Sequence, residues 1–134
     1  MTSGAPKSQN RGPEGESGGG PKGEQTGVPV IDRSVLGEWL AGDDTAINEL
    51  LTVFRDSIRA EQTRMSETLA PGDLREYASA AHRLRGAALS MGARALAETA
   101  GTLYAAARAG DARMCADGMA ELAARIRLVA AEVP

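Results

Sequence analysis

The residues best suited to chemistry in this sequence surround its only histidine, in the stretch AAHRLRGAALSMGA at 80–93. His82 offers an imidazole, which is a nucleophile when neutral. Arg85 adds a fixed positive charge one helical turn later, and Gly86 removes the side chain at the next position. Because glycine weakens a helix, we expect Gly86 where something must approach the backbone closely. On spacing alone, however, a surface histidine without chemistry, a solvent-directed arginine and a packing glycine are the simpler interpretation.

Helical periodicity surrounds this stretch on both sides. Apolar residues recur at spacings of three and four, and Asp, Gly and Pro interrupt the pattern. The last predicted helix contains Gly118, which should weaken it by about 1 kcal/mol relative to alanine. The five predicted helices cover roughly 32–41 (a short one), 43–70, 73–91, 93–109 and 111–133.

Composition favours helices over a sheet. Aromatic residues make up 3% of the chain, so the core must consist of Leu, Ile, Val, Met and Ala. Short connections predict antiparallel neighbours. We therefore predict an all-α fold for residues 30–134, an up-down-up-down four-helix bundle with a short N-terminal helix. Residues 1–29 are rich in Gly and Pro and are predicted to be a disordered tail, either a tether or a leftover linker.

Several functional classes are disfavoured by composition. The net charge of -3 argues against nucleic acid as a partner. The single cysteine, Cys115, cannot form an internal disulfide, which fits a reducing compartment. There is neither an apolar run of membrane-spanning length nor a signal-peptide core, so we expect a cytoplasmic protein without a membrane partner.

The predicted third helix places His82 at the edge of the core. Its inward stripe consists of Leu74, Ala78, Ala81, either Leu84 or Arg85, Ala88 and Met91. His82 is rotated by about 100° from Ala81, so the imidazole should be accessible to solvent. Its neighbours along the helix at i−3, i+3, i+4 and i+7 are Ser79, Arg85, Gly86 and Leu89.

The same stretch resembles the signature of the histidine-containing phosphotransfer (HPt) domain. The matching positions are Ala81-His82, Leu84, Arg85, Gly86, Gly92-Ala93, Leu96, Leu103 and Gly110-Asp111, and the resemblance extends over about residues 30–133. Two positions depart from the family pattern. Arg85 stands where the family most often has Lys, and it keeps the charge. Many members carry Gln or Glu on the fourth helix to support the histidine; here Tyr104, through a hydroxyl hydrogen bond to the imidazole, or Thr102 would take that place.

This resemblance implies a phosphorelay intermediate of two-component signalling. His82 would accept a phosphoryl group on Nε2 from the aspartate of a receiver domain and pass it to another receiver. Arg85 would stabilise phosphoryl charge and Gly86 would allow the partner to approach. The partner surface would include Ser79, Arg83, Leu89 and Tyr104.

The resemblance also implies partners and cofactors. The partners would be response-regulator receiver domains and a sensor histidine kinase, hybrid or not. The chain itself needs no cofactor, since Mg²⁺ is expected in the receiver. We expect a monomeric phosphoryl carrier rather than an autonomous catalyst. No Gly-rich ATP-binding motif is present, so ATP-dependent kinase activity is not expected.

Three alternatives stay open at this point. The chain could be a degenerate HPt-like adaptor that binds a receiver or kinase without carrying phosphate. It could be a detached piece of a larger hybrid or chemotaxis-type kinase. It could also be a purely structural helical protein that self-associates through its alanine-rich faces.

Overall fold

A computed structural model describes residues 29–134, all of whose regular structure is helical. The all-α prediction is thereby confirmed for this part of the chain. The predicted tail, residues 1–29, lies outside the described residues except for residue 29. The helices are α2 (Ser34–Trp39), α3 (Asp44–Leu69), α4 (Leu74–Ser90), α5 (Arg94–Arg108), α6 (Ala112–Asp117) and α7 (Met119–Glu132).

Aspartate side chains cap the N-termini of three of these helices. The side chain of Asp43 accepts a hydrogen bond from the backbone N–H of Ala46, at 3.1 Å. Asp73 caps α4 in the same way, accepting from the N–H of Glu76, and Asp111 caps α6. Each cap satisfies a backbone donor that the first helical turn leaves without a partner.

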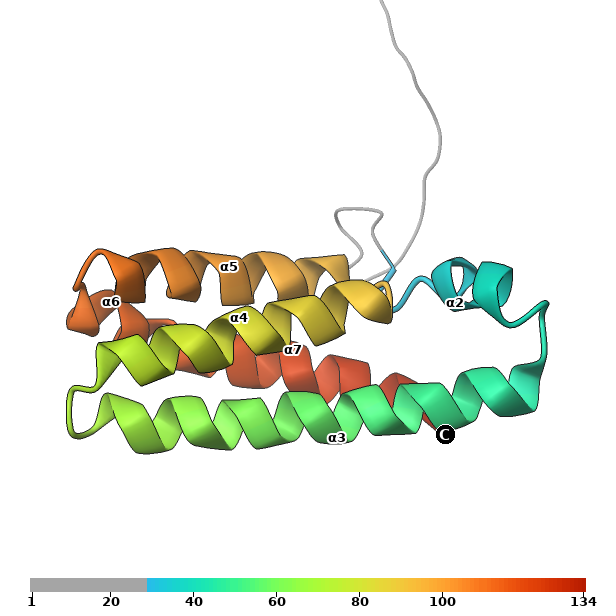
Figure 1. Ribbon diagram of the computed structural model, residues 1–134, viewed down its shortest axis with the longest axis horizontal. Helices are drawn as coiled ribbons and strands as arrows, with labels where there is room; N and C mark the ends of the chain where they lie inside the picture. Colours follow the sequence, from blue (N-terminus) through green and yellow to red (C-terminus); the bar gives the residue numbers. More distant parts are fainter. Residues whose placement is uncertain (1–28) are drawn as a thin grey trace, which may run out of the picture.

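The long helices lie side by side along the long axis of the molecule (Figure 1). The turn after α3 and the turn after α4 lie at opposite ends of α4, so α3, α4 and α5 alternate in direction (Figure 1). Helix α4 packs against both α3 and α5, while α7 contacts α3 and α5. Consequently one side of α4 is enclosed, and the other faces solvent next to α5.

The core is aliphatic and rich in alanine, as the composition predicts. Its largest fully buried side chains come from α2 through α7. They include Leu36, Leu51, Ile58, Met65, Tyr77, Leu84, Leu96, Leu103 and Leu122. Small alanines on α4 and α5 allow these two helices to approach each other closely.

The inward stripe of α4 differs in detail from the predicted one. Leu84 is fully buried and Arg85 is exposed, which decides between the two alternatives. Tyr77 is also fully buried, although the predicted stripe omits it. Its hydroxyl lies 3.3 Å from the carbonyl oxygen of Cys115, to which it donates, and 3.2 Å from Sδ of Met119. These partners satisfy the hydroxyl and allow the whole ring to be buried.

Two further expectations require correction. The predicted helix over 111–133 is divided at Gly118 into α6 and α7. A Cβ at Gly118 would collide with Leu103 of α5, so glycine permits a close approach at this point. The apolar pattern of the short predicted helix over 32–41 includes Trp39 and implies that its ring is buried, but this side chain is 70% exposed. Within residues 29–134, no helix combines the length and apolar character that spanning a bilayer requires.

Candidate functional site

His82 lies in the middle of α4 with its side chain exposed. Its chain neighbour Ala81 and the nearby Leu84 are fully buried, so they fix the rotation of the helix and direct His82 outward. The exposure expected from the sequence is observed. An imidazole in this position can be reached by another macromolecule without any rearrangement of the core.

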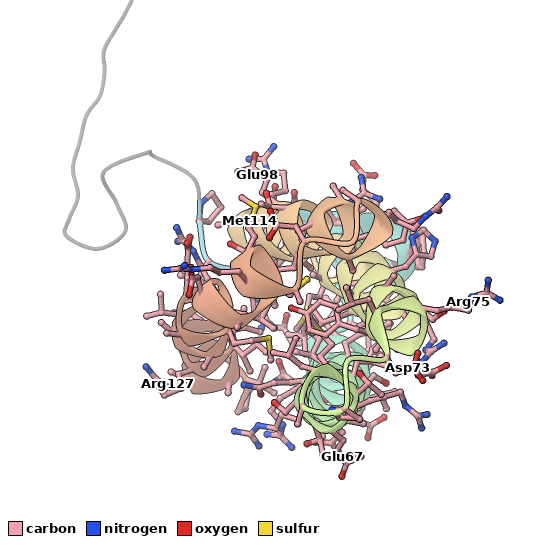
Figure 2. The ribbon with its side chains drawn as sticks, turned by 90° about the vertical axis from the view of Figure 1, so that its left-hand side faces the viewer. Glu67, Asp73, Arg75, Glu98, Met114 and Arg127 are labelled. Atoms are coloured by element: carbon pink, nitrogen blue, oxygen red, sulfur yellow. The ribbon has the colours of Figure 1, made fainter. Side chains whose placement is uncertain are left out.

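An open pocket of about 620 Å³ lies beside His82, between the N-terminal half of α4 and the C-terminal half of α5. Residues at i−7 and i−3 from His82 stand on the same helical face, which places Arg75 and Ser79 in this pocket. Figure 2 shows Arg75 projecting outward, on the side of the molecule opposite Arg127. The polar residues lining the pocket are Arg75, Ser79, His82, Arg83, Tyr104 and Arg108.

Tyr104 of α5 packs against the imidazole through its ring. The ring centroids of His82 and Tyr104 lie 5.3 Å apart, at an interplanar angle of 41°. The Tyr104 hydroxyl accepts a 2.8 Å hydrogen bond from Nη1 of Arg108. The structure therefore differs from the expected hydroxyl–imidazole bond: the ring faces His82 while the hydroxyl binds a guanidinium. Thr102 lines a separate pocket between α5 and the α6–α7 segment and does not support His82.

Arg83, one of the predicted partner residues, is already paired within the protein. Its Nε donates to Oε2 of Glu61 on α3 at 3.0 Å, and its Nη2 lies 3.6 Å from Oε2 of Glu76. The hydrogen bond to Glu61 raises the pKa of Arg83, which stays charged. Its charge is nevertheless compensated by the two carboxylates, so Arg83 adds little net positive potential to the pocket.

Arg85, Gly86 and Leu89 lie along α4 beyond His82 and do not line the pocket. The Arg85 side chain extends across α5, where its Cδ and Nε would lie 3.4 Å from a Cβ at Gly101. A Cβ at Gly86 would meet no atom within 4 Å, which excludes internal helix packing as the reason for this glycine. Leu89 is 43% exposed. The structure thus brings Ser79, Arg83 and Tyr104 together in the pocket on one side of His82. Arg85, Gly86 and Leu89 lie on the other side.

Sequence reasoning missed Arg75 and Arg108. Arg75 lies two helical turns before His82, a spacing that could have identified it. Arg108 stands four residues after Tyr104, so the register of α5 against α4 is needed to bring it to the histidine. Among residues 29–134, neither arginine forms an ion pair with a carboxylate. The pocket therefore combines an accessible imidazole with two uncompensated guanidinium groups, an arrangement suited to an oxyanion.

Comparison with protein families places this chain in a known class. The Hpt domain family model matches residues 49–132, which is more than half of the chain. The match includes α4, α5 and the residues around His82, and it begins after α2. No curated protein and no solved structure matches the chain. On this evidence the protein belongs to the Hpt domain family, whose function is histidine phosphotransfer in two-component phosphorelays.

Proposed function

We propose that His82 is the phosphoacceptor of this protein, taking a phosphoryl group from an aspartyl phosphate of one receiver domain and passing it to the aspartate of another. The proposal is supported by one observation above all. The only histidine of a chain that belongs to the Hpt family is exposed, at the rim of an open pocket, within the matched residues.

The transfer requires no covalent chemistry from other residues. Nε2 of His82 would attack the phosphorus of the aspartyl phosphate and form a P–N bond. The P–O bond to the aspartate breaks, and its electron pair leaves with the carboxylate. A second receiver aspartate would reverse this exchange. Such transfers depend mainly on positioning and charge neutralisation. We propose that Arg85 neutralises part of the phosphoryl charge. Mg²⁺ is expected in the receiver, where it would neutralise the rest.

The docking surface would surround His82 on α4 and α5. In this proposal Gly86 provides the close approach, because a side chain is absent and the space beside it is open. Ser79, Arg83, Leu89 and Tyr104 would contact the receiver. The helical stretches would form the up-down-up-down bundle inferred from the sequence. We expect a monomeric cytoplasmic carrier that docks transiently, since a relay must release each partner.

Transfer of labelled phosphate tests the proposal directly. The purified chain is mixed with phosphorylated receiver domains and, separately, with phosphoramidate as a small phosphoryl donor. We expect a label on the chain that survives base and is lost in acid. His82→Gln should abolish labelling with unchanged circular dichroism, whereas Arg127→Gln, on the opposite side, should label normally. Labelling of the His82→Gln protein would disprove the assignment.

An adaptor without phosphate remains the second candidate, and one observation favours it. Arg85, the basic residue of the family-like signature, lies over Gly101 rather than in the pocket beside the imidazole. An adaptor would bind receiver domains with equal affinity before and after His82→Gln. It would take up no label from either donor.

A further inference from the structure

The pocket beside His82 holds positive charge that the protein does not neutralise. Of its three arginines, Arg83 pairs with Glu61 and Glu76, at 3.0 and 3.6 Å. Within the described residues, Arg75 and Arg108 have no carboxylate partner. Two unpaired guanidinium groups on facing helices, α4 and α5, attract an anion into the space between them.

Arg108 is the better positioned of the two. Its Nη1 donates to the Tyr104 hydroxyl at 2.8 Å, and its Cζ lies 5.7 Å from the centroid of the same ring. That ring is the one packed against the imidazole, with centroids 5.3 Å apart. Tyr104 therefore connects the phosphoacceptor to the cation. A guanidinium held in this way loses less conformational freedom when it binds a ligand than a free side chain would.

Arg85 is placed differently, although the resemblance to the HPt family implies that it is the phosphoryl-binding cation. Its aliphatic stem lies over Gly101, and it does not line the pocket. The cations on the pocket side of the imidazole are thus Arg108 and Arg75. The two sides of His82 can therefore have different tasks in the transfer.

We propose that Arg108, oriented by Tyr104 and assisted by Arg75, binds the phosphoryl oxygens on phosphorylated His82. This inference rests on the proposed function. Arg108 would contact the transferred group itself, and its planar donor pair matches two oxygens of a phosphoryl dianion. Tyr104 is a positioning residue, because it acts through Arg108 and through the orientation of the imidazole.

A carboxylate of the receiver could occupy the same pocket during docking, and thermodynamics separates the two cases. A contact with the phosphoryl group stabilises the phosphorylated chain. It therefore raises the equilibrium constant for transfer from receiver to chain. A contact made only in the complex changes the affinity and the rates but leaves that equilibrium constant unchanged, because the separated reactants and products do not contain it.

The equilibrium constant is measured with a receiver that exchanges phosphate with the wild-type chain. Arg108→Gln should lower it roughly threefold to tenfold, as expected for one charge-assisted hydrogen bond that is partly screened by solvent. Arg108→Lys should retain part of the effect, and Tyr104→Phe should fall between wild type and Arg108→Gln. Arg127→Gln is the matched control and should leave the equilibrium constant unchanged.

A second measurement uses the isolated chain labelled with phosphoramidate. The ³¹P resonance of the phosphoryl group should titrate at a higher pH in Arg108→Gln than in wild type, because a nearby guanidinium favours the dianion. An unchanged equilibrium constant together with an unchanged ³¹P titration would overturn the inference, whatever happens to docking affinity. Failure of the wild-type chain to accept label at all would instead overturn the proposed function.

Discussion

Polar groups on the two sides of helix α4 differ in whether the protein itself provides their hydrogen-bond or ion-pair partners. On the inner side, Tyr77 is fully buried and its hydroxyl donates to the carbonyl oxygen of Cys115. On the outer side, no hydrogen bond within the described residues engages the ring of His82, and Arg75 lacks an ion pair. A buried polar group needs a hydrogen-bond partner within the protein, whereas an exposed one can bond to water and then to a ligand. The comparison separates residues that maintain the helix from residues available to a partner.

The largest effect should come from placing a charge on each side in turn. Leu84→Asp buries an unpaired carboxylate at a fully enclosed position and should cost several kcal/mol, enough to unfold most of the protein. His82→Asp makes the same new side chain two residues away on the exposed side. It should change the free energy of unfolding by less than about 1 kcal/mol. Urea denaturation followed by circular dichroism measures both.

Equal destabilisation by these two variants would contradict the assignment of the two sides. The His82→Asp variant should also fail to take up phosphate, because the imidazole is gone. Leu84→Asp would thus lose stability, whereas His82→Asp would lose phosphoryl uptake and stay folded.

The sequence predicts most of the helices correctly, because periodicity and capping are local properties. Asp43 and Asp73 cap the helices that they were expected to begin, and the exposure of His82 follows from a rotation of one residue along α4. Gly118 is different. Leu103 approaches it closely from another helix, which no single-helix pattern contains.

The candidate site is predicted only in part, for the same reason. Positions at the edge of a helical stripe are ambiguous, so Leu84 and Arg85 could not be distinguished, and Tyr77 fell just outside the predicted stripe. Arg108 shares a pocket with His82 only through the register of α5 against α4. A tyrosine can also interact through its hydroxyl or its ring, and the sequence does not say which one faces the imidazole.

A smaller effect should distinguish the two sides at high pH. Burial raises the pKa of Tyr77, and the neighbouring Cys115 raises it further. Burial also raises the pKa of the Cys115 thiol. The folded protein thus keeps protons that the unfolded chain releases above about pH 9 to 10. The free energy of unfolding is therefore highest below that range with respect to these two groups. It should fall as pH rises, by up to about 1.4 kcal/mol per pH unit for Tyr77.

Tyr77→Phe removes the tyrosine part of this loss, so its stability should decline less steeply than that of the wild type between about pH 10 and pH 12. Tyr104→Phe is the matched control on the outer side and should retain the steep decline. Urea unfolding at each pH gives the slopes. Parallel slopes for wild type and Tyr77→Phe would show that the buried hydroxyl does not control alkaline stability.

The smallest effect in stability concerns Gly86. A methyl group there meets no atom within 4 Å, so Gly86→Ala should stabilise α4 by about 0.5–1 kcal/mol. The same methyl group would stand where the receiver is proposed to approach, and it should slow phosphoryl transfer. Gly118→Ala provides the contrast, since its methyl group would press on the buried Leu103 and should lower stability. Thermal unfolding and transfer rates would be measured for both variants. A Gly86→Ala protein that is more stable and transfers phosphate at an undiminished rate would contradict the proposed role of Gly86. The glycine would then weaken the helix without serving the transfer, and the receiver would dock elsewhere on the exposed side of α4.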